Sequence, residues 1–152
     1  MKKIIAFLLL FAVASCSKFT LSKTIEDFPN KRWEKKDIQT FEFTIEDDIT
    51  ADVAVLFSHV SETQYDEVPL AVTIQDPTGK KETIETKLLL KDPSGKELSD
   101  CVGDVCDLAT VLKEGILMQK GTYIITLQNE TKLPYLPNVL AVGITIETVS
   151  VQ

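Results

Sequence analysis

Apolar residues recur at every second position through most of the chain, and this period limits the possible folds more than any other feature. In residues 38–45 the apolar side chains include Phe41, Phe43 and Ile45, with polar residues between them. Side chains of a strand point alternately to opposite faces, so this period predicts a β-strand with one buried face. The same alternation returns at residues 68–74, 84–90, 123–127 and 140–146, whereas residues 52–60 are apolar on both sides and predict a central strand buried on both faces. Only residues 107–113 could form a short helix, and they could equally be irregular.

Two near copies of one turn motif separate the middle strands. Residues 76–80 are Asp-Pro-Thr-Gly-Lys and residues 92–96 are Asp-Pro-Ser-Gly-Lys. Each fits a type I turn, because Asp caps the backbone, Pro fixes φ and Gly follows where φ can be positive. We interpret both aspartates as turn formers rather than as metal ligands or catalytic groups. About seven or eight strands at this spacing predict an all-β, two-sheet antiparallel β-sandwich with jelly-roll or immunoglobulin-like topology.

The N-terminus is organised like an export signal. Lys2 and Lys3 precede an uncharged apolar run over residues 4–14, which is shorter than the roughly 20 residues that a membrane-spanning helix needs. The run ends in Val-Ala-Ser-Cys, which resembles the bacterial lipobox, so we expect residues 1–15 to be a lipoprotein signal peptide. Cys16 would then be the lipidated first residue of the mature chain. A plain secretory signal followed by a chance cysteine is the alternative.

The mature chain is expected to have two parts and a strongly acidic charge. Residues 16–30 have mixed polarity and no clear period, and we interpret them as a lipidated tether ahead of a β-sandwich domain over residues 31–152. The formal net charge of −7 becomes −9 once Lys2 and Lys3 are removed. An acidic surface argues against nucleic acid as a partner, because binding nucleic acid requires clustered cations. Contact with a membrane is expected only through the lipid anchor.

Cys101 and Cys106 are the two cysteines that remain in the mature chain. An even pair in an exported protein predicts a disulfide, since the compartment outside the cytoplasm is oxidising. Zinc is a weaker interpretation, because no second cysteine pair or histidine cluster lies nearby. Calcium is also weaker, because the aspartates around the pair lack the alternating spacing of an EF-hand loop. We therefore expect no metal site and no cofactor.

Two segments carry candidate contact residues. Trp33 lies in a basic run at residues 30–37, where its ring either packs over the edge of the sandwich or forms an exposed platform for a sugar or a partner. Leu133, Tyr135 and Leu136 lie in a segment that two prolines break, which predicts a loop. That loop is either an apolar contact patch or a connection folded onto its own sandwich.

The residues suited to catalysis are few. His59 is the only imidazole, and it lies near the end of a predicted strand, on the same face as Val53, Val55 and Phe57. A phosphate-binding glycine loop, a GxSxG motif and an HExxH motif are all absent from the sequence. We therefore interpret His59 as a structural residue and expect the protein not to be an enzyme.

The order of the motifs along the chain resembles a known family. After the lipobox come Phe-Pro-Asn-Lys-Arg-Trp at residues 28–33, Phe-Glu-Phe-Thr-Ile at 41–45, Gly-Thr-Tyr at 121–123 and Val-Gly-Ile-Thr-Ile-Glu at 142–147. This order is similar to that of the gliding-motility lipoprotein H (GldH) family of Bacteroidetes. The resemblance implies a non-catalytic lipoprotein of the cell envelope, facing the periplasm or held in the outer membrane. It would contact other envelope or gliding-machinery proteins and serve gliding motility or the linked type 9 secretion machinery.

A surface carbohydrate-binding module is the alternative function. Such a module would use Trp33 and Tyr135 as stacking platforms. Exposed, coplanar aromatic rings in a concave groove would favour it, whereas a buried Trp33 would favour contact with a protein partner.

Overall fold

The structure, a computed structural model, describes residues 18–150 and is almost entirely β-strand within that range. One short 3₁₀ turn, η1, covers Pro29–Lys31. The strands in the first half are β1 Thr20–Ile25, β2 Arg32–Glu34, β3 Gln39–Ile45, β4 Ile49–Val60, β5 Glu67–Gln75 and β6 Lys81–Leu89. Those in the second half are β7 Asp100–Val102, β8 Val105–Met118, β9 Gly121–Asn129, β10 Tyr135–Pro137 and β11 Val139–Thr148.

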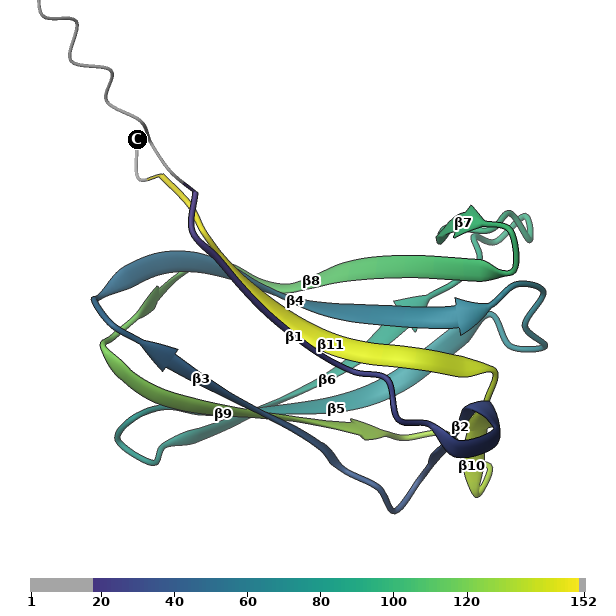
Figure 1. Ribbon diagram of the computed structural model, residues 1–152, viewed down its shortest axis with the longest axis horizontal. Coiled ribbons are helices and arrows are strands. Elements are labelled where there is room, and N and C mark those ends of the chain that lie inside the picture. Colours follow the sequence, from purple (N-terminus) through teal and green to yellow (C-terminus); the bar gives the residue numbers. More distant parts are fainter. Residues whose placement is uncertain (1–17, 151–152) are drawn as a thin grey trace, which may run out of the picture.

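The strands form two packed sheets and a small ribbon (Figure 1). The first sheet has the strand order β1-β11-β4-β8-β7, and the second sheet has the order β3-β9-β5-β6. β2 and β10 pair with each other as a two-stranded ribbon at one end of the sandwich. Every strand pair is antiparallel. The predicted antiparallel β-sandwich is therefore confirmed.

The topology is that of a jelly roll. The three shortest strands, β2, β7 and β10, lie at the margins, and eight longer strands remain. In chain order, the first, eighth, third and sixth of these form the first sheet, and the second, seventh, fourth and fifth form the second sheet. This order is that of a double-sheet jelly roll and differs from the strand order of an immunoglobulin sandwich. Of the two predicted topologies, the structure has the jelly roll.

The core lies between the two sheets and is built by the alternation that the sequence shows. On β4 the odd-numbered residues Val53, Val55 and Phe57 point inward and are at most 1% exposed. Phe41 and Phe43 of β3 point inward from the opposite sheet, each 2% exposed. Removing such side chains from water is the main stabilising contribution to a fold of this kind. One continuous core therefore holds both sheets together.

The predicted tether over residues 16–30 is wrong for much of its length. Thr20–Ile25 forms β1, an edge strand of the first sheet, which pairs along its whole length with β11. Leu21 and Ile25 point toward the core, but the position between them is occupied by Lys23, whose Nζ lies 5.6 Å from the centroid of the Phe43 ring. A lysine at an inward position interrupts the apolar alternation, so the strand has no clear period in the sequence. The folded domain therefore begins before residue 31.

The short helix considered for residues 107–113 is also wrong, because this segment lies within β8. Leu108 and Leu112 pack against the core, whereas Val111 is 50% exposed on the opposite face. Apolar residues at 108, 111 and 112 imitate the three- and four-residue spacing of a helix. The segment is nevertheless a strand that carries apolar side chains on both faces.

Both Asp-Pro turns have the predicted structure. Gly79 N donates to Asp76 O at 2.9 Å and Gly95 N donates to Asp92 O at 2.9 Å, while the two glycines have φ of 87° and 84°. Each aspartate also accepts hydrogen bonds through its carboxylate from the backbone and hydroxyl two residues later. These hydrogen bonds lower the pKa of both carboxyl groups. The two aspartates are turn formers, as the sequence predicted.

Candidate functional site

The N-terminal part of the described chain is fixed to the sheet close to the predicted lipidation site. Phe19 N donates to Thr148 Oγ1 at 2.8 Å, and Thr148 N donates to Phe19 O at 2.9 Å. Cys16 and the signal peptide over residues 1–15 lie outside the described residues. Only residues 17–19 separate Cys16 from the first residue of β1. Within residues 18–150, no helix has the length and apolar character required to cross a bilayer.

Trp33 and Leu136, two of the predicted contact residues, are buried. They are cross-strand partners in the β2–β10 ribbon and are 0% and 3% exposed. The Trp33 ring lies 6.1 Å from the Phe28 ring, centroid to centroid, and its Nε1–H donates to Asp37 O at 2.8 Å. A buried indole with a satisfied N–H belongs to the core. The structure therefore corrects the prediction that these two side chains offer a contact surface.

Leu133 and Tyr135, the other two predicted contact residues, lie at the surface. Leu133 is 58% exposed, and Tyr135 is partly exposed with the Arg32 guanidinium 4.4 Å from its ring centroid. The guanidinium covers one face of the ring, which leaves less of it open for stacking on a sugar. The predicted loop is wrong in part, because Tyr135–Pro137 forms strand β10 of the ribbon. The segment thus divides into a buried part that anchors the ribbon and an exposed part.

Cys101 and Cys106 are joined by a disulfide between β7 and β8. They are cross-strand partners with Cα atoms 4.0 Å apart, and Cys106 is fully buried. The hairpin that they close carries Val102 at 82% exposure and Val105 at 44% exposure. In Figure 1 this hairpin stands up from one end of the first sheet. The sequence predicted the disulfide but not that its loop would display apolar side chains.

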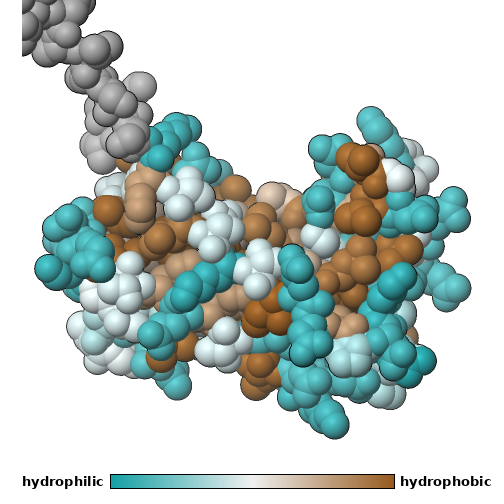
Figure 2. Space-filling model, viewed as in Figure 1, coloured by the Kyte–Doolittle hydropathy of each residue, from teal (hydrophilic) through white to brown (hydrophobic). Residues whose placement is uncertain are grey.

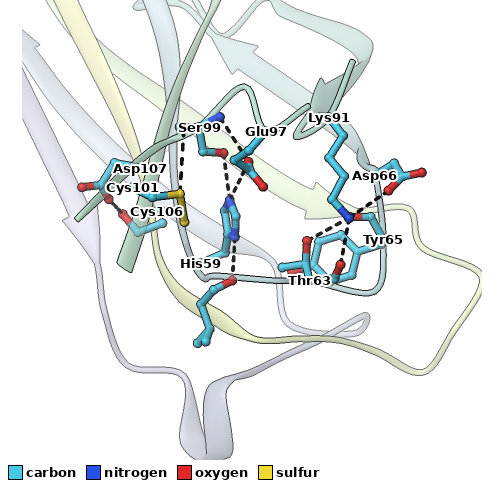
Figure 3. Close-up of polar contacts among 12 residues, drawn as sticks. His59, Thr63, Tyr65, Asp66, Lys91, Glu97, Ser99, Cys101, Cys106 and Asp107 are labelled. Carbon is cyan, nitrogen blue, oxygen red and sulfur yellow. Dashed lines mark hydrogen bonds and ion pairs between the residues drawn. A yellow bond between two sulfur atoms is a disulfide. The ribbon is translucent and has the colours of Figure 1, made fainter. Parts of the chain in front are cut away.

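His59 is fully buried beneath the connection between β6 and β7 (Figure 3). Its Nδ1 lies 2.9 Å from Val60 O, and its Nε2 lies 2.8 Å from Ser99 Oγ. A carbonyl oxygen can only accept, so Nδ1 donates to Val60 O, and in that tautomer of the neutral ring Nε2 accepts the hydrogen bond from the Ser99 hydroxyl. The imidazole therefore ties the end of β4 to the residue just ahead of β7.

The arrangement of Ser99, His59 and Glu97 differs from that of a catalytic triad. In a triad the carboxylate orients the imidazole from the nitrogen opposite the serine. Here Glu97 Oε1 lies 3.8 Å from Nε2, on the serine side, and accepts a hydrogen bond from Ser99 N at 3.1 Å. The opposite nitrogen bonds only to a backbone carbonyl. This geometry indicates polar contacts that hold the connection between β6 and β7 in place. The absence of enzymatic activity stays a prediction.

A second polar contact holds the same connection. Lys91 Nζ donates to Thr63 O at 3.1 Å and lies 3.2 Å from Asp66 Oδ1 (Figure 3). Together with the histidine, this lysine fixes residues 90–99 against the end of the sandwich. The contacts of His59 and Lys91 thereby position the disulfide hairpin, which follows this connection in the chain. Across the part of the chain that the structure describes, no group of three histidine, cysteine or acidic residues has the arrangement of a metal site.

The comparisons with known structures reach only distant proteins. The chain is similar to a serine protease of Aeromonas sobria in complex with a chaperone, at 9% identity and a TM-score of 0.39 over 89% of this chain and 28% of that one. A second structure of an Aeromonas sobria serine protease gives 11% identity and a TM-score of 0.33 over 88% and 27% of the two chains. The chain thus spans little more than a quarter of these proteins. Likenesses of this strength carry no argument about function.

The comparison with protein families is more specific. No curated protein matches the chain significantly. The sequence pattern of the GldH lipoprotein family, however, matches residues 20–146, which run from the first residue of β1 almost to the end of β11. This match confirms the resemblance seen in the order of the motifs, and the chain belongs to the GldH lipoprotein family.

Proposed function

We propose that this protein is lipidated at Cys16 and works by binding other proteins of the cell envelope that serve gliding motility or the linked type 9 secretion machinery. As a member of the GldH lipoprotein family, the chain is a membrane-anchored lipoprotein of the envelope. The family match over residues 20–146 is the observation that carries the proposal. The lipobox before Cys16 supports the position of the anchor.

The position of β1 supports a function carried out at the membrane surface. Four residue steps separate Cys16 from Thr20, and an extended chain covers about 14 Å over that length. A domain held on so short a connection stays beside the lipid headgroups. Its partner is therefore a membrane protein or a protein that reaches the membrane surface.

The distribution of aromatic and aliphatic side chains favours a protein partner over a carbohydrate. Trp33 is fully buried and the Tyr135 ring is covered on one face by Arg32, so neither offers the open platform that a carbohydrate-binding module needs. Leu98, Val102 and Leu133 are between 47% and 82% exposed. Exposed aliphatic side chains of this kind are typical of surfaces that bind proteins.

The proposal is tested by replacing the chromosomal gene with Cys16→Ser and, separately, by deleting it. We expect Cys16→Ser to move the protein from the detergent phase to the aqueous phase in a Triton X-114 partition. Both changes should reduce colony spreading or the release of type 9 secretion cargo. Detergent partitioning that Cys16→Ser leaves unchanged would contradict the lipid anchor. Normal spreading and secretion in the deletion strain would contradict the proposed role.

The partner is sought by cross-linking in intact cells and purification from envelope membranes. Leu133→Asp and Val102→Asp are the test variants, and Thr83→Asp, on the outer face of the second sheet, is the matched control. We expect recovery of a defined envelope protein that one or both test variants lose and that the control retains. Identical recovery with all three variants would show that these residues are not the contact surface.

A further inference from the structure

The outer face of the first sheet carries small and apolar side chains where a solvent-facing sheet normally carries polar ones. The strand register aligns residues of β11, β4 and β8 in two adjacent rows. These rows are Gly143, Leu56 and Ala109, and then Thr145, Ala54 and Val111. Ala54, although it points away from the core, is only 7% exposed. The two rows therefore form a shallow apolar floor.

Neighbouring segments turn this floor into a groove. The connection ahead of β7 brings Leu98 over the sheet, and the disulfide hairpin rises beside it. They bound a cleft of about 470 Å³, which we call the sheet-face groove and define by Leu56, Leu98, Ala109, Ala141 and Asp107. In Figure 2 the upper side of the molecule is hollowed between the raised hairpin and the region where β1 begins. A partner could therefore bury apolar side chains here without any movement of the backbone.

The charged residues that line the groove, Asp100 and Asp107, have one sign. Asp107 and Asp100 are cross-strand partners of β8 and β7 at the hairpin side, and Ser58 of β4 donates a hydrogen bond to Asp107. At the other side of the apolar rows, Glu147 and Asp52 are cross-strand partners of β11 and β4. Among the described residues that line the groove, none is a lysine or an arginine. Carboxylates thus lie on both sides of the apolar floor, but Glu147 pairs with Lys18 at 3.5 Å, and the two that line the groove itself are Asp100 and Asp107.

We propose that the sheet-face groove binds a segment of a partner protein in which lysine or arginine side chains flank apolar residues. The apolar side chains would cover Leu56 and Ala109, and a cation would pair with Asp107 or Asp100. Charged groups around an apolar centre, when they are opposite in sign to those of the partner, speed the encounter of the two proteins and fix the register of the bound segment. The inference rests on the proposed function only in taking a protein as the partner.

The same observations disfavour other occupants. Anionic lipid headgroups and nucleic acid would be repelled by Asp100 and Asp107 in an acidic chain. A carbohydrate would be expected to stack on an aromatic ring, and Phe57, the aromatic residue that lines the groove, is 1% exposed. Carbohydrate is nevertheless kept as an outcome of the test.

The test titrates the full chain, as purified from membranes in mild detergent, against two fluorescent heptapeptides. One alternates lysine with leucine, and the other has glutamate in place of every lysine. Fluorescence anisotropy is read against a detergent blank at low and at high salt. We expect the lysine peptide to bind about tenfold or more tightly than the glutamate peptide, and to weaken as salt rises.

Groove variants locate the binding site. Leu56→Arg should weaken binding of the lysine peptide by about tenfold. Asp100→Asn with Asp107→Asn should weaken its binding by about fivefold. The matched controls are Leu117→Arg, at an exposed position nearer the other end of β8, and Glu42→Gln with Glu85→Gln on the second sheet. Both controls should bind as the parent does. Melting temperatures confirm that each variant is folded.

Several results would overturn the inference. These are equal affinity for the two peptides, no binding at millimolar concentration, or groove variants that bind as tightly as the parent. Binding of N-acetylchitohexaose that Leu56→Arg abolishes, without peptide binding, would assign the groove to carbohydrate instead. The titration does not depend on lipidation at Cys16, so failure of the groove and failure of the anchor are separate results.

Discussion

The outer faces of the two sheets have opposite chemistry although they enclose the same core. On the second sheet the register aligns one threonine from each of its four strands, in the row Thr40, Thr126, Thr73 and Thr83. Thr73 Oγ1 and Thr83 Oγ1 lie 2.9 Å apart, within hydrogen-bonding distance. On the first sheet the corresponding central rows contain glycine, alanine, leucine and valine, with Thr145 as their one polar residue. One sandwich therefore presents a polar face and an apolar face.

This difference separates the outward positions whose side chains are explained by folding alone from those whose side chains are not. Inward alternation on both sheets is sufficient to build the core, and threonine-rich outward positions satisfy β-propensity while remaining compatible with water. The threonine row of the second sheet follows that rule, while Leu89 at the end of β6 is an exception at 51% exposure. The first sheet departs from it at the rows beside the disulfide hairpin, and a local departure from folding rules in a consistent fold is typical of a functional surface.

The largest expected effect comes from filling the apolar face at Gly143. A Cβ atom at this position would lie 2.7 Å from Lys23 O and 3.0 Å from Thr24 Oγ1, so Gly143→Val should force β1 away from β11. We expect a loss of about 3 kcal/mol in the free energy of unfolding. Thr126→Val, at a central position of the polar face, should change it by about 0.5 kcal/mol or less. Urea unfolding of both variants measures the difference, and equal midpoints would remove this contrast between the faces.

Opening the hairpin beside the apolar face should have the next largest effect. The disulfide closes a loop of six residues, and the double variant Cys101→Ser with Cys106→Ser should lose about 2 kcal/mol in the chain-entropy account. The second sheet has no such bond among the residues that the structure describes, so its own β5–β6 turn should be unaffected. Thermal unfolding with and without reductant checks this. In reductant, the melting temperature of the parent should fall to that of the double variant. A melting temperature that reductant leaves unchanged would contradict the stabilising role of the disulfide.

A smaller effect is expected at the seam between the sheets. Tyr65, just ahead of β5 of the second sheet, donates its hydroxyl to Pro137 O, just ahead of β11 of the first, at 2.8 Å. Tyr65→Phe should cost about 1 kcal/mol at neutral pH. The variant is measured by urea unfolding, with Tyr135→Phe, at a partly exposed ring, as the control.

The same tyrosine gives the molecule a dependence on alkaline pH. Burial raises the pKa of Tyr65 above its ordinary value of about 10. The folded state therefore holds this proton at a pH where the unfolded chain loses it, and the stability that the tyrosine contributes is present below about pH 10 and declines above it. The free energy of unfolding of Tyr65→Phe should fall less steeply than that of the parent as the pH rises above about 10. Parallel pH profiles for parent and variant would be inconsistent with a buried phenol.

The smallest effect is expected on the polar face itself. Thr73→Val removes the hydrogen bond to Thr83 and keeps a β-branched side chain of similar shape. We expect a change within about 0.5 kcal/mol by urea unfolding. A loss of more than about 1 kcal/mol would show that the threonine row stabilises the sandwich, and the polar face would then be more than a solvated surface.

The sequence predicts the parts of the fold in which one residue type serves one purpose. Phe41 and Phe43 alternate cleanly because their outward neighbours are polar. The odd-numbered residues of β4 keep the same period, although their outward neighbour Leu56 is also apolar. The Asp-Pro turns are predictable because each residue has its own geometric role. Cys101 and Cys106 are predictable because they are the only two cysteines left after the lipobox.

The sequence misleads where one position serves two purposes. Lys23 faces the core from an edge strand and interrupts the apolar alternation by which β1 could have been predicted. Val111 and Ala109 give β8 a second apolar face, so that its sequence resembles that of a helix. The second case is instructive, because Val111, which completes the helix-like spacing with Leu108 and Leu112, belongs to the outward rows that form the apolar floor. Trp33 misleads for another reason, since charged neighbours in sequence say little about a ring that packs against Phe28. Partners such as Ser99 and Glu97 of His59 depend on a connection forty residues away, and no local pattern indicates them.

The pairing of the first strand with the last also determines when the molecule can fold. β11 lies between β1 and β4, and among residues 18–150 it is the only strand that β1 pairs with. Until residues 139–148 have been made and released, β1 has no neighbour and one side of β4 is open. Contacts between residues so distant along the chain form slowly, because a long loop must close before they contribute. The ten residues of β11 thus act as a completion step, which joins the region next to the predicted lipid anchor to the rest of the domain only after they have been made.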